Sequence, residues 1–219
     1  YTAVADDIAV ILAHHSGNGA FNTPSGYTIA TDGTTTLNDN NTIDQRVTVF
    51  WRRLVGGDTA PTFQLATNTV TTVRGAILII IRGCVNSATP FEVCGRNLNA
   101  AAALISFPSL TTTIGKTMLL ALGAYEDDPT TRTTPTGWNQ PVTSGAVFTS
   151  ALGSGMALNY FLNYQDAAGA TGSFTTTVSG GTFANSPSVG AVLAFRSTVA
   201  AVATSLVLPT NAMRDVMVL

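Results

Sequence analysis

The two halves of the chain carry the same sequence anchors in the same order. Pro24 recurs as Pro135 and Phe50 recurs as Phe161, each 111 residues later. A fixed order of anchors at nearly constant spacing indicates that one structural unit is present twice. Further matches join residues 8–12 to 118–122, Phe63 to Phe174, and residues 75–78 to 190–193.

Charged residues make up 10% of the 219 residues and the net charge is −2, whereas charged residues are about 25% of a typical globular domain. A chain of this length is long enough for one large or two small domains, and its core needs no disulfide or metal. Lys116 is the one lysine and the nine arginines are scattered. We therefore expect no nucleic-acid partner and no cofactor.

No segment has the length or pattern of a membrane or targeting signal. The longest apolar run, residues 76–81, is far shorter than the ~20 residues that a spanning helix needs. The first residues lack the charged start and apolar stretch of a signal peptide. We predict no membrane insertion and no targeting segment.

Short β-branched or alternating runs bounded by Gly, Pro, Asn and Asp indicate strands in both halves. We predict an all-β fold of two homologous antiparallel β-sandwich repeats, Ig-like or jelly-roll-like, with little or no helix. The expected strands are residues 8–14, 27–31, 46–54, 62–67 and 75–82 in the first half, and residues 110–114, 118–125, 138–142, 157–165, 173–178 and 189–196 in the second.

Alternation within the strands predicts which side chains face the core. Val47, Val49 and Trp51 share one face of a strand. In the equivalent run at 158–162, Leu158, Tyr160 and Leu162 likewise share one face. Residues 76–81 are apolar on both faces, so we expect this strand to be buried on both sides where the two repeats meet. It is the expected centre of the fold.

The expected boundaries are a first repeat at 1–95, a linker at 96–108 and a second repeat at 109–200. Asn97 to Leu104 is the only weakly helical run and is expected as a turn in the linker. The apolar residues of 201–219 would leave an unpaired strand edge unless they are covered. This tail is either the start of a third unit or a strand donated to a neighbouring subunit.

Two Pro-x-Gly segments have the form of tight turns, because Pro presets the first torsion and Gly accepts the positive one. The aromatic residue that follows would cap the core, although an exposed aromatic could also stack on sugars. The turn and core anchors are Pro24, Gly26, Tyr27, Pro135, Gly137 and Trp138.

No reaction motif stands out from the sequence. His14 and His15 are adjacent, so on a strand they point to opposite faces and cannot easily chelate one ion. Glu126, Asp127 and Asp128 lack the alternating spacing of a calcium loop and indicate an exposed acidic tip. Neither a Gly-x-Ser-x-Gly elbow nor a phosphate-binding loop is found. We expect no catalytic or metal site.

The loops at 16–22 and 126–133 are expected at the ends of the sandwiches, where a partner or glycan would bind. The candidate contact residues are His15, Asn18, Phe21, Asn22, Tyr125, Glu126, Asp127 and Asp128.

Cys84 and Cys94 are the only cysteines, and the loop between them contains Pro90. In an oxidising compartment they could form a short disulfide. Two thiols in a surface loop could equally stay free, and the sequence leaves both outcomes open.

Taken in order, the anchors at 6–12, 24–27, 47–53, 56–63 and 75–83, with Pro90 a few residues on, resemble a β-sandwich module common in structural proteins of tailed bacteriophages and in some large bacterial surface proteins. Residues 108–196 resemble the companion half of that module. These are strand and turn patterns, so they are more specific for the fold than for a function. The resemblance implies a tail, fibre or capsid-decorating protein with no enzymatic residues. The His14–His15 pair and the cysteine loop depart from the pattern.

These observations favour a non-enzymatic structural component of a phage particle that acts through self-assembly and surface presentation. Its partners would be itself and other virion proteins, and its location the extracellular virion. The alternative is a carbohydrate-binding adhesin module that recognises surface glycans through loop tips or aromatic side chains. A secreted polysaccharide-degrading enzyme is a third hypothesis and would require a carboxylate pair in a cleft.

Overall fold

The computed structural model describes residues 4–17, 19–41, 45–59, 61–62, 64, 74–127, 129, 131–140, 146–149, 155–180 and 186–197. In these ranges every regular element is a strand, which confirms the all-β prediction. The strands form two five-stranded antiparallel sheets and smaller ladders beside the second of them.

The first sheet has the order β2-β4-β1-β5, and β3 also pairs with β4. It is built from the first half of the chain. Its strands are β1 (Ala5–Ser16), β2 (Thr28–Ile29), β3 (Asn38–Asn41), β4 (Gln45–Val55) and β5 (Arg74–Ile81).

The second sheet has the order β11-β12-β9-β15-β6. Its strands are β6 (Phe91–Ala102), β9 (Thr117–Tyr125), β11 (Ala146–Thr149), β12 (Gly155–Gln165) and β15 (Ser186–Arg196). The smaller ladders join β10 (Thr131–Arg132), β14 (Phe174–Ser179) and β7 (Leu104–Phe107), and β13 (Gly169–Ala170) to β8 (Thr111–Thr112).

Corresponding long strands of the two halves occur in the same order, β4-β1-β5 in one sheet and β12-β9-β15 in the other. A short contact beside them also corresponds. Thr28 pairs with Trp51 in the first sheet, and Asn139 bridges Leu162 in the second, each residue 111 positions later. The similar patterns in the two half-sequences thus accompany a similar pairing of their long strands.

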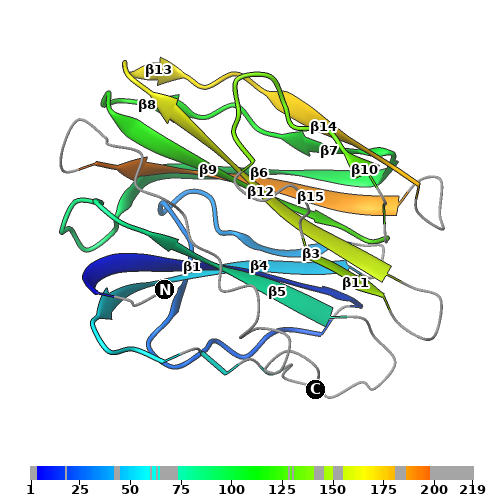
Figure 1. Cartoon of the computed structure of the whole chain (residues 1–219), viewed down its shortest axis with the longest axis horizontal. Helices are drawn as coiled ribbons and strands as arrows, with labels where there is room; N and C mark the ends of the chain where they lie inside the picture. The colour runs from blue at the N-terminus through cyan, green and yellow to red at the C-terminus, as the bar shows by residue number, and fades with distance from the viewer. Residues whose placement is uncertain are drawn as a thin grey trace.

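The largest core lies between the two sheets and draws side chains from both halves. Val47 and Val49 of β4 face it, with Trp51 packed against it, and Leu158 and Tyr160 of β12 face it from the other sheet, as their alternation predicted. β12 lies against β1 and β5. Figure 1 shows the sheet of β1, β4 and β5 below the sheet of β9, β12 and β15.

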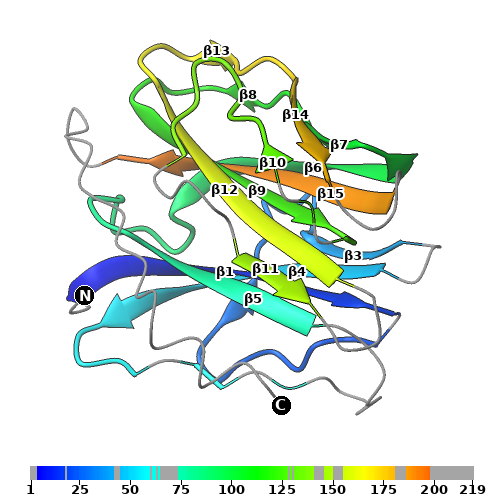
Figure 2. The ribbon, with the colours of Figure 1, turned by 45° about the vertical axis from the view of Figure 1, so that its right-hand side comes forward.

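A second core covers the opposite face of the second sheet, beneath β7 and β14. The ring of Phe174 stacks on Phe107 with centroids 4.5 Å apart, and Trp138 tilts against Phe174 at 4.2 Å. Figure 2 shows these outer strands above the second sheet. The second sheet is therefore buried on both faces and forms the middle layer of the molecule.

Residues 96–108, expected as a linker, contain most of β6 and all of β7, so this prediction was wrong. The expected turn from Asn97 to Leu104 is likewise in strands. Asparagine and alanine are poor strand formers, but pairing along β15 overrides their local preference. By pairing with β15, β6 also brings a strand from the first half of the sequence into the sheet of the second half.

Residues 76–81 are largely buried, and Ile77, Ile79 and Ile81 face the core between the sheets. This confirms the predicted burial of both faces. The strand is not the centre of its sheet, however, because β5 is the last of the described strands in it, while β1 has neighbours on both sides. The apolar composition reflects the layers above and below β5 rather than a central place in the sheet.

Gly190 of β15 packs directly against a strand of the outer layer, and a β-carbon built on it would meet the backbone carbonyl oxygen of Ser106. A backbone atom cannot move aside as a side chain can, so we expect Gly190→Ala to lower the free energy of unfolding by about 3 kcal/mol, the upper end for overpacking. Gly95→Ala is the control, because its β-carbon would meet the mobile end of Leu110 at 2.7 Å. Urea unfolding should show the larger loss in Gly190→Ala, and equal losses would contradict the packing described.

Candidate functional site

The contact residues expected in the first loop are partly buried. His15 is 1% exposed, its ring shares a hydrogen bond with the carbonyl of Gly19, and it meets the ring of Phe21 edge-on at 5.1 Å. Asn22 is exposed, and its backbone amide donates to the carbonyl of Gln64 at 2.9 Å. His15 and Phe21 therefore hold the loop in place, and Asn18 lies outside the described residues.

The acidic loop of the second half is also drawn inward. Tyr125 is 2% exposed and its hydroxyl accepts a hydrogen bond from the amide of Ser186 at 3.2 Å. Asp127 is 1% exposed, and the amide of Glu126 donates to the carbonyl of Pro187 at 3.0 Å. Because Asp127 is buried, the described part of this segment is not an exposed acidic tip. Asp128 lies outside the described residues.

Both Pro-x-Gly segments form turns closed by the same hydrogen bond. The amide of Tyr27 donates to the carbonyl of Pro24, and that of Trp138 to Pro135, both at 3.0 Å. Gly26 and Gly137 have φ of 78° and 81°, where a side chain would be strained. Trp138 is 8% exposed and packed in the second core, so it offers no open face to a sugar.

His14 is fully buried on the face of β1 opposite to that of His15, as expected of neighbours on a strand. Neither of its ring nitrogens has a hydrogen-bond partner in the described part of the chain. Burial, with the charge of His15 as a smaller cause, lowers the pKa of His14 to about 3. Gln45, which lies diagonally across from it on β4, is also buried with both amide atoms unpaired. Among the described residues no group of three or more His, Cys, Asp or Glu is placed to hold a metal.

Cys84 and Cys94 are free and buried, so the disulfide that the sequence left open is not formed. Burial raises the pKa of each thiol to about 12. A thiol at neutral pH is a poor nucleophile compared with a thiolate. The two cysteines therefore contribute to the core between the sheets rather than to a reactive centre.

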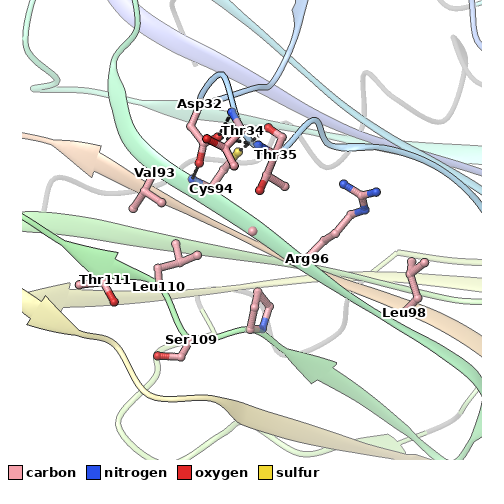
Figure 3. A pocket seen from close by; sticks show the side chains of 12 residues that line it. Asp32, Thr34, Thr35, Val93, Cys94, Arg96, Leu98, Ser109, Leu110 and Thr111 are labelled. Carbon is pink, nitrogen blue, oxygen red and sulfur yellow. Dashed lines mark hydrogen bonds between the residues drawn. The ribbon is translucent and has the colours of Figure 1, made fainter.

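A groove of about 660 Å³ lies along β6, where the first sheet meets the second. Its floor is the part of β6 from Val93 to Leu98, the turn around Asp32 forms one wall, and the loop from Pro108 to Thr111 forms the other. Figure 3 shows Asp32, Thr34 and Thr35 on one side of β6 and Ser109, Leu110 and Thr111 on the other. The lining therefore mixes hydroxyl groups, one guanidinium and apolar side chains.

Asp32 joins the turn of the first half to β6. One carboxylate oxygen accepts hydrogen bonds from the amides of Thr34 and Thr35 at 2.8 and 2.7 Å, and the other accepts from the amide of Cys94 at 3.0 Å. Burial alone would raise the pKa of Asp32, but these amide hydrogen bonds lower it below its ordinary value. The carboxylate thus fixes one wall of the groove.

Arg96 makes a second link between the two sheets. Its guanidinium forms an ion pair with Asp39 of β3 and donates a hydrogen bond to the carbonyl of Thr36 at 2.6 Å. Asp39 is only 5% exposed. Burial raises its pKa although the charges of Arg96 and Arg46 act in the opposite direction. The carboxylate therefore depends on its arginine partners to stay ionised in the interior.

The floor of the groove is also a strand edge that no strand of the described residues pairs with. β6 is the last of the described strands in the second sheet, and the amide of Cys94 points away from β15 because it donates to Asp32. Directions alternate along a strand, so the backbone amides and carbonyls of Arg96 and Leu98 point the same way. Among the described strands none pairs with this edge. Leu98 is 46% exposed beside it.

The sequence did not single out Asp32, Arg96 or Leu98. The Asp-Gly step at 32–33 signals a turn, but nothing local shows that this carboxylate reaches an amide 62 positions away. Arg96 was placed in a linker, so its pairing with Asp39 was not foreseen. These residues come together only through the pairing of β6 with the distant β15.

No helix among the described residues is long and apolar enough to cross a membrane. The chain matches no protein-family model, no curated protein and no solved structure.

Proposed function

We propose that the protein is a non-enzymatic structural component of a phage particle and that it works by associating with further copies of itself and with other particle proteins. The observation that carries the proposal is the open edge of β6 at the floor of the groove. A free strand edge offers unpaired backbone donors and acceptors to another chain. The sequence resemblance to phage structural modules supplies the particle as the setting.

The composition supports the same proposal. The groove is lined by short hydroxyl side chains, and Leu98 and Leu110 add apolar contact. Short side chains lose little conformational entropy when they are ordered at an interface. Of the described charged residues that line the groove, Asp32 and Arg96 are already engaged with neighbouring elements. A partner would therefore meet a surface whose charges need not be rearranged.

Leu98→Lys tests this proposal, because a lysine at a strand edge opposes pairing with another strand. We expect the natural protein to form oligomers as its concentration rises, and Leu98→Lys to remain monomeric under the same conditions. Ile114→Lys is the matched control, since Ile114 is 41% exposed but lies outside the named strands. The measurement is sedimentation velocity with circular dichroism as a check of folding. A natural protein that stays monomeric, or a Leu98→Lys variant that associates equally, would overturn the proposal.

The second candidate is a carbohydrate-binding module, favoured by the hydroxyl groups of Thr34, Ser109 and Thr111 around the same groove. Its volume is in the range of ligand pockets, roughly 300–1,000 Å³. Glycan-array binding that is lost in Thr34→Val together with Thr111→Val would support this candidate. Trp138→Ala is not a suitable probe, because Trp138 is part of the second core.

A further inference from the structure

The direction of the backbone groups in the first sheet can be followed from β4 to β5. The amide of Val49 donates to the carbonyl of Leu37 at 2.9 Å, so the backbone N–H and C=O of Val49 point away from β1. Its neighbours Thr48 and Phe50, which pair with Ala13 and Ile11, therefore point toward β1. The backbone groups of Ala13 and Ile11 therefore point toward β4. Because these directions alternate along a strand, the backbone groups of the even-numbered residues of β1 point toward β5.

The outer edge of β5 has no strand partner among the described residues. Even-numbered residues of β1 pair with odd-numbered residues of β5, for example Val10 with Ile79. The backbone amides and carbonyls of Ala76, Leu78 and Ile80 consequently point away from β1 toward the free edge. β5 thus has two largely buried apolar faces and one unpaired edge, which is the kind of strand that proteins normally cover.

The second sheet covers the corresponding edge. β15 matches β5 in sequence and in its place beside the central strand, and its outer side is paired with β6 along nearly the whole strand. β6 is the strand that follows β5 in the chain. The first half therefore donates a strand to the sheet of the second half. The edge of β5 is where a strand donated by the second half would pair with the sheet of the first half.

The spacing along the chain identifies a segment for that place. β6 begins ten residues after β5 ends, and the same interval counted from the end of β15 at Arg196 reaches Leu206. Leu206 opens the apolar run that continues to Leu208. The segments that follow β5 and β15 also start side by side, because Cys84 bridges Ser197 and the amide of Val85 donates to the carbonyl of Arg196 at 3.0 Å.

We propose that the segment beginning at Leu206 pairs with the free edge of β5 in the same chain, so that each half completes the sheet of the other. Residues 198–219 lie outside the described residues, and the proposal rests on β5, β6 and β15 and on the sequence of the tail. Pro209 is compatible with this place, since an edge strand tolerates proline where its N–H would face outward. The inference does not depend on the proposed function.

Residue-resolved amide hydrogen exchange on the full chain tests this pairing. We expect the amides of Ala76, Leu78 and Ile80 to be protected to a degree similar to those of Ile77 and Ile79. The double variant Leu206→Pro with Leu208→Pro removes two backbone donors from the tail, and we expect the protection of the three outward amides to fall by at least about 100-fold. The amides that point toward β1 should keep their protection in the same sample.

Val216→Pro with Val218→Pro is the matched control, because it alters the second apolar run of the tail and leaves the run at Leu206 intact. It should leave the exchange of all β5 amides unchanged. Outward amides that exchange freely in the natural protein, or that remain protected in the Leu206→Pro and Leu208→Pro variant, would overturn the proposal. Light scattering completes the test: the protection should be present in the monomer, and protection found only in dimers would assign the strand to a neighbouring chain instead.

Discussion

Replacing His14 with leucine is expected to remove a loss of up to about 5 kcal/mol in the free energy of unfolding, which the natural protein undergoes as the pH falls from 6.5 toward 3. His14 is fully buried, and its pKa falls to about 3, mainly because of that burial. In the unfolded chain the imidazole has an ordinary pKa near 6.5. Between these two values the unfolded state binds a proton that the folded state does not.

The sign of the effect follows from this difference. Above about pH 6.5 His14 is neutral in both states and makes no pH-dependent contribution to stability. As the pH falls from 6.5 toward 3, proton binding stabilises the unfolded state progressively, so the free energy of unfolding decreases. Below pH 3 both states are protonated and this contribution stops growing.

Urea unfolding of the natural protein and of His14→Leu at a series of pH values measures this contribution. At pH 8 the two proteins should be of similar stability, or the variant more stable, because leucine removes two buried nitrogens that have no described partner. The difference between the two curves isolates His14 from the carboxylates, which titrate in both proteins. Curves that stay parallel from pH 8 to pH 3 would contradict the buried neutral histidine.

Arg96→Met is expected to destabilise the protein by about 3–5 kcal/mol, because it leaves the buried carboxylate of Asp39 without its nearest cation. Burial already raises the pKa of Asp39, and loss of Arg96 removes a charge that lowers it. Asp39 belongs to the first sheet and Arg96 to the second. The variant therefore weakens the contact between the two sheets beside the groove.

The double variant Arg96→Met with Asp39→Leu should recover most of the lost stability, since no uncompensated charge then remains in the interior. Lys116→Met is the control for loss of a cation, because Lys116 and Asp166 form an ion pair on the exposed surface. It should leave the unfolding midpoint unchanged. If Arg96→Met were as mild as Lys116→Met, or if the double variant were less stable than Arg96→Met alone, the assigned role of the pair would be wrong.

The strands with strong local patterns were predictable from the sequence. β1, β4, β5, β9, β12, β14 and β15 fall close to their expected positions, because branched or alternating apolar residues mark them. β6 was missed because its sequence is rich in small and amide residues and its pairing partner lies about 90 positions away. The alternation that local patterns record says nothing about such distant pairing.

The candidate site was less accessible from sequence than the fold. The expected contact loops place His15, Tyr125 and Asp127 in the interior. The hydrogen bond of Tyr125 depends on Ser186, which is distant in the chain, whereas His15 is held by the nearby Gly19 and Phe21. The groove arises from the same crossing of β6, which brings Arg96 to Asp39 and Cys94 to Asp32. Each pair joins residues about 60 positions apart in the chain, so no local motif contains it.

The two halves, joined by the shared core and the crossing of β6, are expected to unfold as one unit. The two tryptophans test it, because Trp51 packs against the core between the sheets and Trp138 lies in the second core. In Trp138→Phe, the fluorescence of Trp51 reports on the first half while circular dichroism reports on the whole chain. In Trp51→Phe, the fluorescence of Trp138 reports on the second half. In each variant the fluorescence and dichroism transitions in urea should coincide in midpoint and slope. Fluorescence and dichroism transitions with separate midpoints would show that the halves unfold independently and would contradict the account.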